Sequence, residues 1–286
     1  MKKKYWVAYK TLVVVCVICA LQVTQVSARE GREMIKFGVY PYKSPHTLVK
    51  LFSPIAKRIE TTLGVKVQLV TAPDFDAYIA RGKQGEYDLA LPCVNCFFQI
   101  QPAGYSVIAK GEPSFYGGTI VRKDSGIVNV AQLKGKRIAS VGKHSYAAHL
   151  FLLDQLHEAG VDPMQDVHFQ FLGKLDTIIL GVLNKKYEAG TVRTDALENP
   201  IFKEIRHELK FISQSSPIPQ FPFVVKQDLP LEQVSKIQAV LVGLSLDNAE
   251  DKEILKSMRL TKISPATDAD YDAFRKKLTQ AQALSH

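Results

Sequence analysis

The chain has 286 residues, of which 46% are hydrophobic and 23% charged, and its formal net charge is +9. This length holds one large domain or two smaller ones with real hydrophobic cores, so folding does not depend on disulfides. Because no long run of lysine or arginine occurs, the positive charge is poor support for nucleic acid binding, but it is compatible with a small anionic ligand.

Residues 1–28 have the pattern of a secretory signal peptide. Three lysines at positions 2–4 precede an apolar run over about residues 12–23, and small residues suited to a cleavage site end at Ala28. Cleavage there removes four lysines and no acidic residue, which leaves 258 residues with a net charge of about +5. No membrane anchor is expected, because the run is short for a bilayer span and neither Cys16 nor Cys19 follows the small residue of a lipoprotein site.

The first part of the mature chain alternates predicted strands and helices. Residues 34–40 (MIKFGVY) and 65–71 (VKVQLVT) have the composition of strands. A helix is predicted between them from apolar residues at the 3.6-residue period: Leu48, Leu51, Phe52, Ile55, Ile59 and Leu63. A second helix near 75–84 leads to a strand at 87–91 (YDLAL). Strand, helix and strand in succession imply parallel pairing.

The same alternation continues further along the chain. Strands are predicted at 137–141 (RIASV), 167–172 (VHFQFL) and 189–193 (AGTVR), with a helix from about Ser145 and a short helix before the last strand. We therefore predict an α/β protein with largely parallel sheets.

Two extended segments, 119–123 (TIVRK) and 221–226 (FPFVVK), are predicted to carry the chain to a second lobe and back. From residue 231 to the end, the sequence is nearly all helical in period. A TIM barrel also fits the length and the alternation, but the two crossing segments and the helical C-terminal part argue against eight regular units.

Cys93 and Cys96 lie in LALPCVNCFF (89–98), directly after a predicted strand. A thioredoxin-like motif should open a long helix in a much smaller fold, and haem attachment needs a histidine where Phe97 stands. Structural zinc needs two further ligands at regular spacing, which His144 and His149 do not provide. A disulfide, favoured in an oxidising compartment, and thiol contact with a ligand both stay open.

Seven stretches, in order, resemble the phosphate, phosphite and phosphonate substrate-binding proteins of ABC transporters. They are 38–72 (GVYPYKSPHTLVKLFSPIAKRIETTLGVKVQLVTA), 85–91 (GEYDLAL), 113–127 (PSFYGGTIVRKDSGI), 133–142 (LKGKRIASVG), 189–198 (AGTVRTDALE), 216–225 (SPIPQFPFVV) and 268–274 (DADYDAF). The resemblance implies the type II periplasmic-binding fold, with two α/β lobes, two crossing hinge strands and a ligand cleft. We expect residues 29–117 and 219–286 to form one lobe and 118–218 the other.

The resemblance also implies a partner and a location. It points to a periplasmic protein that passes a small anion to an ABC permease, or to a sensing receptor that docks on a membrane histidine kinase. We expect a monomer with no cofactor, no metal and no catalytic activity. The sequence has no GxSxG, P-loop or HExxH motif, in keeping with a binding protein rather than an enzyme.

The best candidate for the anion site is VGKHSYAAH (141–149). Ligands in open α/β sheets collect at the carboxyl ends of strands, near helix N-termini, and the family has a Ser/Thr-rich phosphate-gripping turn at this position. Ser145 is expected to cap the helix and offer its hydroxyl, with Lys143, His144 and Tyr146 as nearby donors. An ordinary helix cap with exposed neighbours is the alternative.

Candidate contacts from the other lobe follow the first strand. Tyr42 and Ser44, beside Tyr40, match the region from which the family's first lobe contacts its ligand, although aromatic residues there can also serve packing alone. Tyr116, just before the first crossing segment, is a candidate cleft residue with hinge packing as its alternative.

Arg193 departs from the family's pattern. Phosphonate binders place an acidic residue near the end of this strand, where it meets the ligand's amino group, but GTVRTDALE has Arg193 there. An arginine repels an amine and binds an oxyanion through paired hydrogen bonds. The predicted ligand therefore has no cationic group, and a surface ion pair of Arg193 with Asp195 or Glu198 is the alternative.

Leu175 is a second departure, because many relatives carry a polar residue, often histidine, at this helix start. Lys174, Asp176 and Thr177 are candidate substitutes for that polar residue.

The cysteine segment also matches a cleft-lining part of the family, where Gly, Ser, Pro or His residues are usual. Cys93, Asn95 and Cys96 are therefore candidate ligand contacts. Some members of this broad family sense arsenite, and two neighbouring thiols are good ligands for trivalent arsenic. The ligand itself stays open among phosphate, phosphite, a phosphonate, a sulfur oxyanion, a carboxylate and arsenite.

Overall fold

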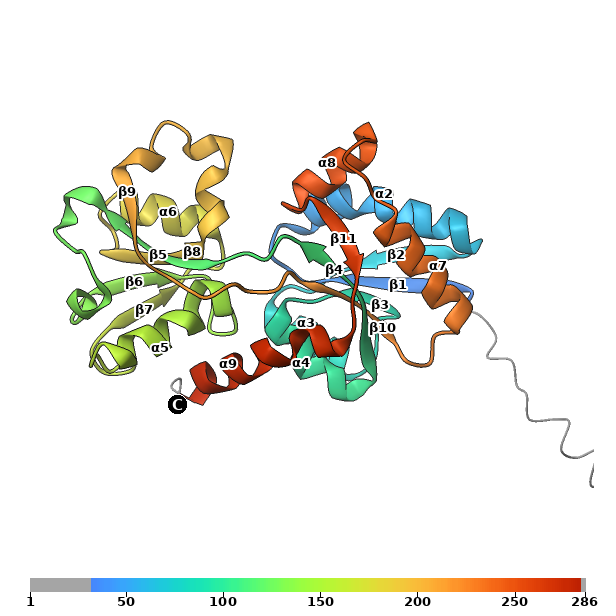
Figure 1. Cartoon of the computed structure of the whole chain (residues 1–286), viewed down its shortest axis with the longest axis horizontal. Helices are drawn as coiled ribbons and strands as arrows, with labels where there is room; N and C mark the ends of the chain where they lie inside the picture. The colour runs from blue at the N-terminus through green and yellow to red at the C-terminus, as the bar shows by residue number, and fades with distance from the viewer. Residues whose placement is uncertain (1–31, 284–286) are drawn as a thin grey trace, which may run out of the picture.

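The computed structural model describes residues 32–283. The predicted signal peptide and its cleavage site lie outside the described residues, as do Cys16 and Cys19. The described chain forms two sheets, each flanked by helices on both faces (Figure 1). We call the part built on the six-stranded sheet the first lobe and the part built on the five-stranded sheet the second lobe.

The sheet of the first lobe has the strand order β11-β4-β10-β3-β1-β2. Its strands are β1 (Met34–Val39), β2 (Lys66–Val70), β3 (Leu89–Leu91), β4 (Tyr105–Glu112), β10 (Pro222–Lys226) and β11 (Lys262–Pro265). One face packs against α2 (Pro45–Leu63), α7 (Leu231–Val242) and α8 (Ala249–Ser257). The other packs against α3 (Phe75–Lys83), α4 (Val94–Ile100) and α9 (Asp272–Ala283) (Figure 1).

Local sequence explains the bounds of α2. The Ser44 hydroxyl accepts a hydrogen bond from the Thr47 N–H at 3.3 Å, and Pro45 occupies the first turn, where its missing N–H costs nothing. Gly64 ends the helix in the left-handed region with φ of 70°, which glycine adopts without strain. The apolar stripe predicted from the sequence faces the sheet, and Phe52, Ile55 and Ile59 are fully buried.

The sheet of the second lobe has the order β7-β6-β8-β5-β9. Its strands are β5 (Gly117–Arg122), β6 (Arg137–Ser140), β7 (His168–Phe171), β8 (Ala189–Arg193) and β9 (Leu209–Gln214). Its helices are α6 (Leu175–Leu183) on one face and, on the other, the short helix η5 (Tyr146–Leu150) continuing into α5 (Phe151–Glu158). Single turns of helix connect other elements: η2 (Gln101–Ala103), η3 (Lys123–Ser125), η4 (Val130–Leu133), η6 (Thr194–Glu198), η7 (Pro200–Phe202), η8 (Arg206–Glu208) and η9 (Asp268–Tyr271).

Two antiparallel segments join the lobes, at residues 113–116 and 215–220. The Phe115 N–H donates to the Ile218 carbonyl at 3.0 Å, and the Ile218 N–H donates back at 2.8 Å. The crossing therefore precedes both segments that the sequence suggested, because 119–122 and 222–226 already belong to strands β5 and β10. Helix α9 extends from the first lobe beneath the second (Figure 1).

The predicted α/β class is correct, but the sheets are mixed rather than largely parallel. Pairs built by strand–helix–strand units are parallel, namely β1–β2, β1–β3, β6–β7 and β6–β8. The strands next to the crossing form antiparallel pairs. The chain runs from β4 of the first sheet into β5 of the second, and it returns in the opposite direction from β9 into β10. The C-terminal part is also less helical than predicted, since β11 pairs with β4 between α8 and α9.

Candidate functional site

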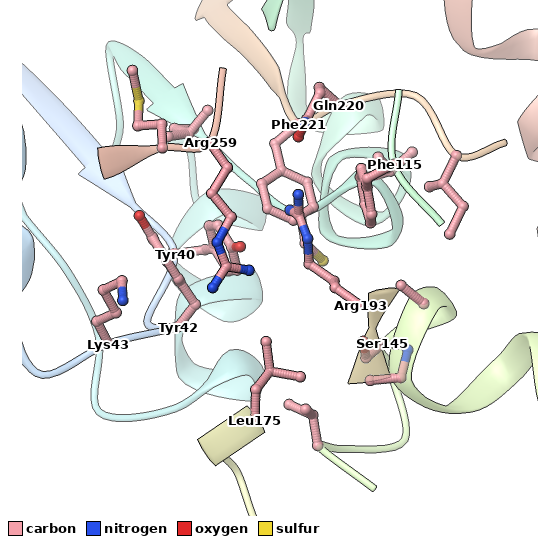
Figure 2. Close-up of a pocket in the computed structure, with 18 of the residues that line it drawn as sticks. Tyr40, Tyr42, Lys43, Phe115, Ser145, Leu175, Arg193, Gln220, Phe221 and Arg259 are labelled. Atoms are coloured by element: carbon pink, nitrogen blue, oxygen red, sulfur yellow. Dashed lines mark hydrogen bonds between the residues drawn. The ribbon is translucent and has the colours of Figure 1, made fainter. Parts of the chain in front are cut away.

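A cavity of about 420 Å³ lies between the two lobes (Figure 2). Its first-lobe wall includes Tyr40, Tyr42, Lys43, Ser44, Phe75, Cys93, Asn95, Phe221, Arg259 and Phe274. Its second-lobe wall includes Ser145, Tyr146, Ala147, Ala148, Lys174, Leu175, Asp176, Arg193 and Asn199. The crossing segments contribute Phe115, Ile218 and Gln220. The volume lies in the range of sites for small organic ligands.

The first-lobe wall is an aromatic cluster. The ring of Tyr40 stacks on Tyr42 with centroids 4.7 Å apart, and meets Phe221 edge-on at 4.9 Å and Phe75 at 5.8 Å. Burial raises the pKa of Tyr42 to about 12 and that of Tyr40 well above its ordinary value. Both phenols are therefore neutral over the ordinary pH range and act as apolar surfaces with a polar tip.

The second-lobe wall is shaped by a kink after strand β6. The Ser145 hydroxyl accepts from the Ala148 N–H at 3.3 Å, and the backbone of Ala148 departs from helical geometry with φ of −123°. The freed carbonyl of Ala148 accepts hydrogen bonds from the buried hydroxyls of Ser140 and Thr191. The start of η5 lines the cavity, and the Ala148 carbonyl is satisfied from behind.

This arrangement requires a glycine on the neighbouring strand. A Cβ atom added to Gly117 would lie 2.5 Å from the Ala147 carbonyl oxygen, too close for any side chain. Strand β5 therefore approaches η5 closely only because residue 117 is glycine.

Helix α6 also begins at the cavity. Lys174, Leu175 and Asp176 line it, and the Lys174 side chain makes no capping hydrogen bond. The first N–H groups of this nine-residue helix and its dipole favour an anion at this end of the cavity. Thr177, the third substitute considered for a polar residue at position 175, does not line the cavity.

Two arginines from opposite lobes share one carboxylate at the other side of the cavity. The Arg193 Nε and Nη2 donate to the two Asp195 oxygens at 3.1 and 2.7 Å, and the Arg259 Nη1 donates to Asp195 Oδ1 at 3.0 Å. The Arg193 guanidinium carbon lies 3.8 Å from the Phe115 ring centre and 5.6 Å from that of Phe221. Aromatic faces and Asp195 thus hold Arg193 in place.

The charges around Asp195 determine its ionisation. Burial alone would raise its pKa, but the hydrogen bonds and charge of Arg193, together with those of Arg259, hold the pKa below its ordinary value. Asp195 is therefore ionised at neutral pH. The ion pair of Arg193 with Asp195 that was considered as an alternative is present, but it is not a surface pair. The Arg193 side chain is only 13% exposed and lines the cavity. Glu198, the other partner considered, pairs with Arg206.

Seven of the eleven predicted contacts line this cavity: Tyr42, Ser44, Cys93, Asn95, Ser145, Tyr146 and Arg193. The other four do not. Cys96 is fully buried behind the wall, Lys143 points to solvent, and Tyr116 lines a second hollow beyond Arg259. His144 contacts the first lobe, with its Nε2 2.7 Å from Asp76 Oδ1.

Asn95 also serves a contact between the lobes. Its amide nitrogen donates to the His144 carbonyl at 2.9 Å, and its amide oxygen accepts from Gln282 of α9 at 3.2 Å. A further contact between the lobes joins Tyr146 and Phe274, whose ring centroids are 4.6 Å apart. Asn95 and His144, which the sequence suggested as ligand donors, are therefore engaged with protein groups on opposite sides of the cleft.

The two cysteine sulfurs lie within bonding distance of each other, with Cα atoms 5.0 Å apart. Cys93 caps α4, and its Sγ accepts from the Cys96 N–H at 3.1 Å. Only Cys93, 8% exposed, reaches the cavity wall. A ligand held by both sulfurs would therefore need Cys96 to move out of the core.

Arg259 is the residue that sequence reasoning missed. It follows α8 in a left-handed conformation with φ of 59°, and its guanidinium enters the cavity beside Tyr40 and Tyr42 (Figure 2). It is 64 residues from Asp195 in sequence and belongs to no motif. Phe221 was predicted only as the start of the second crossing segment and Phe115 was given no role, although both line the cavity.

Neither a metal centre nor a membrane span is evident in residues 32–283. No cluster of three or more His, Cys, Asp or Glu side chains suited to a metal ion occurs there. No helix in the same range is long and apolar enough to cross a bilayer.

Comparison with known proteins places the chain among binding proteins. A family described as "ABC transporter, phosphonate, periplasmic substrate-binding protein" matches residues 37–271. The phosphonates-binding periplasmic protein of Escherichia coli (strain K12) is 26% identical over 243 residues, covering 81% of this chain and 72% of that protein.

One solved structure and one sensor protein add to this comparison. PhnD1 of Prochlorococcus marinus (MIT 9301), solved with methylphosphonate, is similar with a TM-score of 0.78 at 18% identity, covering 88% of this chain and 99% of that one. This confirms the expected fold. The tetrathionate sensor histidine kinase TtrS of Salmonella typhimurium (strain LT2) is 28% identical over 104 residues, covering 35% of this chain and 18% of that protein.

Proposed function

The chain belongs to the family of periplasmic phosphonate substrate-binding proteins of ABC transporters, and from this premise we propose that it captures a small oxyanion without a cationic group. The ligand sits between the lobes, which close over it by hinge motion at the crossing segments. No bond is made or broken, in keeping with a family of solute-binding proteins. Within the described residues, the proposed closing units are 32–116 with 219–283 and 117–218, one residue from the expected boundary because Gly117 already pairs with Arg193 in the second sheet.

The position of Arg193 carries the proposal. Its guanidinium lines the cavity, and its carboxylate partner Asp195 is already shared with Arg259. A ligand ammonium group at this place would meet two arginines and no free carboxylate. An oxyanion there gains charge-assisted hydrogen bonds instead.

Binding titrations test this preference. We expect methylphosphonate, phosphate or phosphite to bind, and 2-aminoethylphosphonate to bind at least about tenfold more weakly than ethylphosphonate. Arg193→Gln should lower oxyanion affinity about a hundredfold, because removing one partner of a desolvated charge pair costs about 2–3 kcal/mol. Calorimetry measures both effects.

Arg206→Gln is the matched control, since Arg206 belongs to the second lobe but forms an exposed pair with Glu198 outside the cavity. It should leave affinity unchanged. Tight binding of 2-aminoethylphosphonate that survives Arg193→Gln contradicts the proposal.

We propose delivery to an ABC permease as the next step. The stretch similar to TtrS supports a second candidate, a receptor for a membrane sensor kinase. The membrane protein encoded by the neighbouring gene, reconstituted with this protein, distinguishes transport from sensing. Ligand-loaded binding protein should stimulate ATP hydrolysis if that membrane protein is a permease, and autophosphorylation if it is a kinase. Stimulation of a kinase alone would replace the transport proposal.

For the cysteines we propose a disulfide between Cys93 and Cys96 rather than ligand thiols. The proposed export to the periplasm, with removal of the signal peptide after Ala28, supplies the oxidising environment that favours this bond. Protein isolated from the periplasm should start at Arg29 and contain no free thiol, which N-terminal sequencing and thiol titration measure. Two free thiols that arsenite protects would support arsenite as the ligand instead.

A further inference from the structure

The guanidinium N–H groups around Asp195 are only partly engaged in hydrogen bonds. Arg193 binds Asp195 through Nε and Nη2, which leaves its Nη1 without a hydrogen-bond acceptor in residues 32–283. Arg259 uses only Nη1, so its Nε and Nη2 also have no acceptor within that range. Two positive charges face one negative charge here, which leaves one net positive charge within this group of three residues. We call Arg193, Asp195 and Arg259 the arginine pole.

The arginine pole lies apart from the helix starts that suit a first anion. In Figure 2, Ser145 and Leu175 lie at one side of the cavity, while the guanidinium group of Arg193 lies against Phe221 and that of Arg259 beside Tyr40 and Tyr42. The rings of Tyr40 and Tyr42 border the space between the two sides. The cavity thus has two places that attract negative charge and an aromatic surface between them.

The cavity of about 420 Å³ has room for a molecule longer than a single small oxyanion. We propose that the ligand carries two anionic groups at opposite ends of a short apolar spacer. A phosphonate or similar group binds at Ser145 and the start of α6, and a carboxylate or sulfonate binds at the arginine pole. This inference rests on the proposed function and names the substrate class of the same site.

Asp195 gives the arginine pole its selectivity. Because its carboxylate already cancels one of the two arginine charges, a singly charged group completes the neutralisation. The arginines come from opposite lobes, so an anionic group bound to both also joins the lobes. This contact differs from those of Asn95 and His144, which join the lobes without a charged ligand group.

A matched ligand series on the full mature protein tests the inference. The probes are 3-phosphonopropionate, which has two anionic ends, and propylphosphonate, which lacks the carboxylate. We expect 3-phosphonopropionate to bind at least about tenfold more tightly, the gain of one charge-assisted hydrogen-bonded pair. Arg259→Gln should reduce its affinity to about that of propylphosphonate.

Lys252→Gln is the control variant, because Lys252 is an exposed cation on α8 that does not line the cavity. It should keep the full tenfold preference, and thermal midpoints show whether each variant is folded. Equal affinity for the two probes, or an unchanged preference in Arg259→Gln, overturns the second anionic group while the proposed function stands. If neither probe nor any single oxyanion binds, the proposed function itself fails.

Discussion

The two walls of the cavity differ in their chemistry. On the first-lobe wall, Tyr40, Tyr42 and Phe221 form a continuous aromatic surface, into which Arg259 projects, and the Lys43 Nζ lies 5.7 Å from the centre of the Tyr42 ring. The second-lobe wall presents helix starts and Arg193, with small residues at Ala147 and Ala148. The first-lobe wall offers mainly apolar area together with Arg259 and Lys43, and the second-lobe wall offers mainly hydrogen-bond donors, so ligand specificity requires both lobes at once.

The hydrophobic interiors behind the two walls differ in the titratable side chains that they bury. The first lobe buries Tyr78, Tyr87, Tyr105 and Tyr271, whose pKa values burial raises. The second lobe instead buries His149 behind its wall, and burial lowers the pKa of that histidine to about 4. We therefore expect alkali to destabilise the first lobe and acid to destabilise the second.

The largest expected effect concerns the aromatic wall. Tyr40→Ala should lower the free energy of unfolding by about 3 kcal/mol, because it empties a buried site in contact with three rings. Chemical denaturation of the ligand-free protein measures this loss. Tyr116→Ala, at a 40% exposed ring outside this cluster, should cost less than about 1 kcal/mol. Equal losses would show that the aromatic wall is no more tightly packed than the surface.

A smaller effect concerns acid. His149 packs edge-on against Phe169 and Phe171, and its Nδ1 has no hydrogen-bond partner in residues 32–283. The unfolded chain binds a proton as pH falls below about 6.5, whereas the folded histidine does so only near 4. The stabilisation is therefore nearly complete above pH 6.5, and about 2.5 kcal/mol of it is lost between pH 6.5 and 4.

Unfolding free energies over that pH range measure the slope. His149→Gln should flatten it, whereas His168→Gln, at an exposed position on β7, should leave it unchanged. A slope that persists in His149→Gln would assign the acid sensitivity to carboxylates rather than to this histidine.

The smallest effect concerns the Tyr42 hydroxyl. It makes no hydrogen bond within residues 32–283, so Tyr42→Phe should change the unfolding free energy by less than about 0.5 kcal/mol. If the Tyr42 ring contributes only apolar area, ligand affinity is unchanged too. A loss of affinity of about threefold or more would show that the Tyr42 hydroxyl donates a hydrogen bond to the ligand. Calorimetry on the same variant separates these outcomes.

Most strands and helices were predictable, because their signals are local. The apolar period of α2, its Ser44 cap and Gly64 lie within one stretch of sequence. Strand β11 was missed because four residues ending in Pro265, between two helices, carry no alternating pattern. Antiparallel pairing was missed for a different reason, since it depends on where the chain crosses between sheets rather than on any single strand.

The features of the site fall into two groups in the same way, those with a local sequence signal and those that arise only from the fold. The sequence by itself determined the family resemblance, the order of the elements and the exceptional arginine at position 193, because each is a property of a continuous stretch. Only the tertiary structure brought Arg259 to Asp195, turned Asn95 and His144 toward each other, and placed Cys96 behind the wall. Those contacts depend on how two lobes meet, and residues far apart in sequence carry no local signal of the partners that packing gives them.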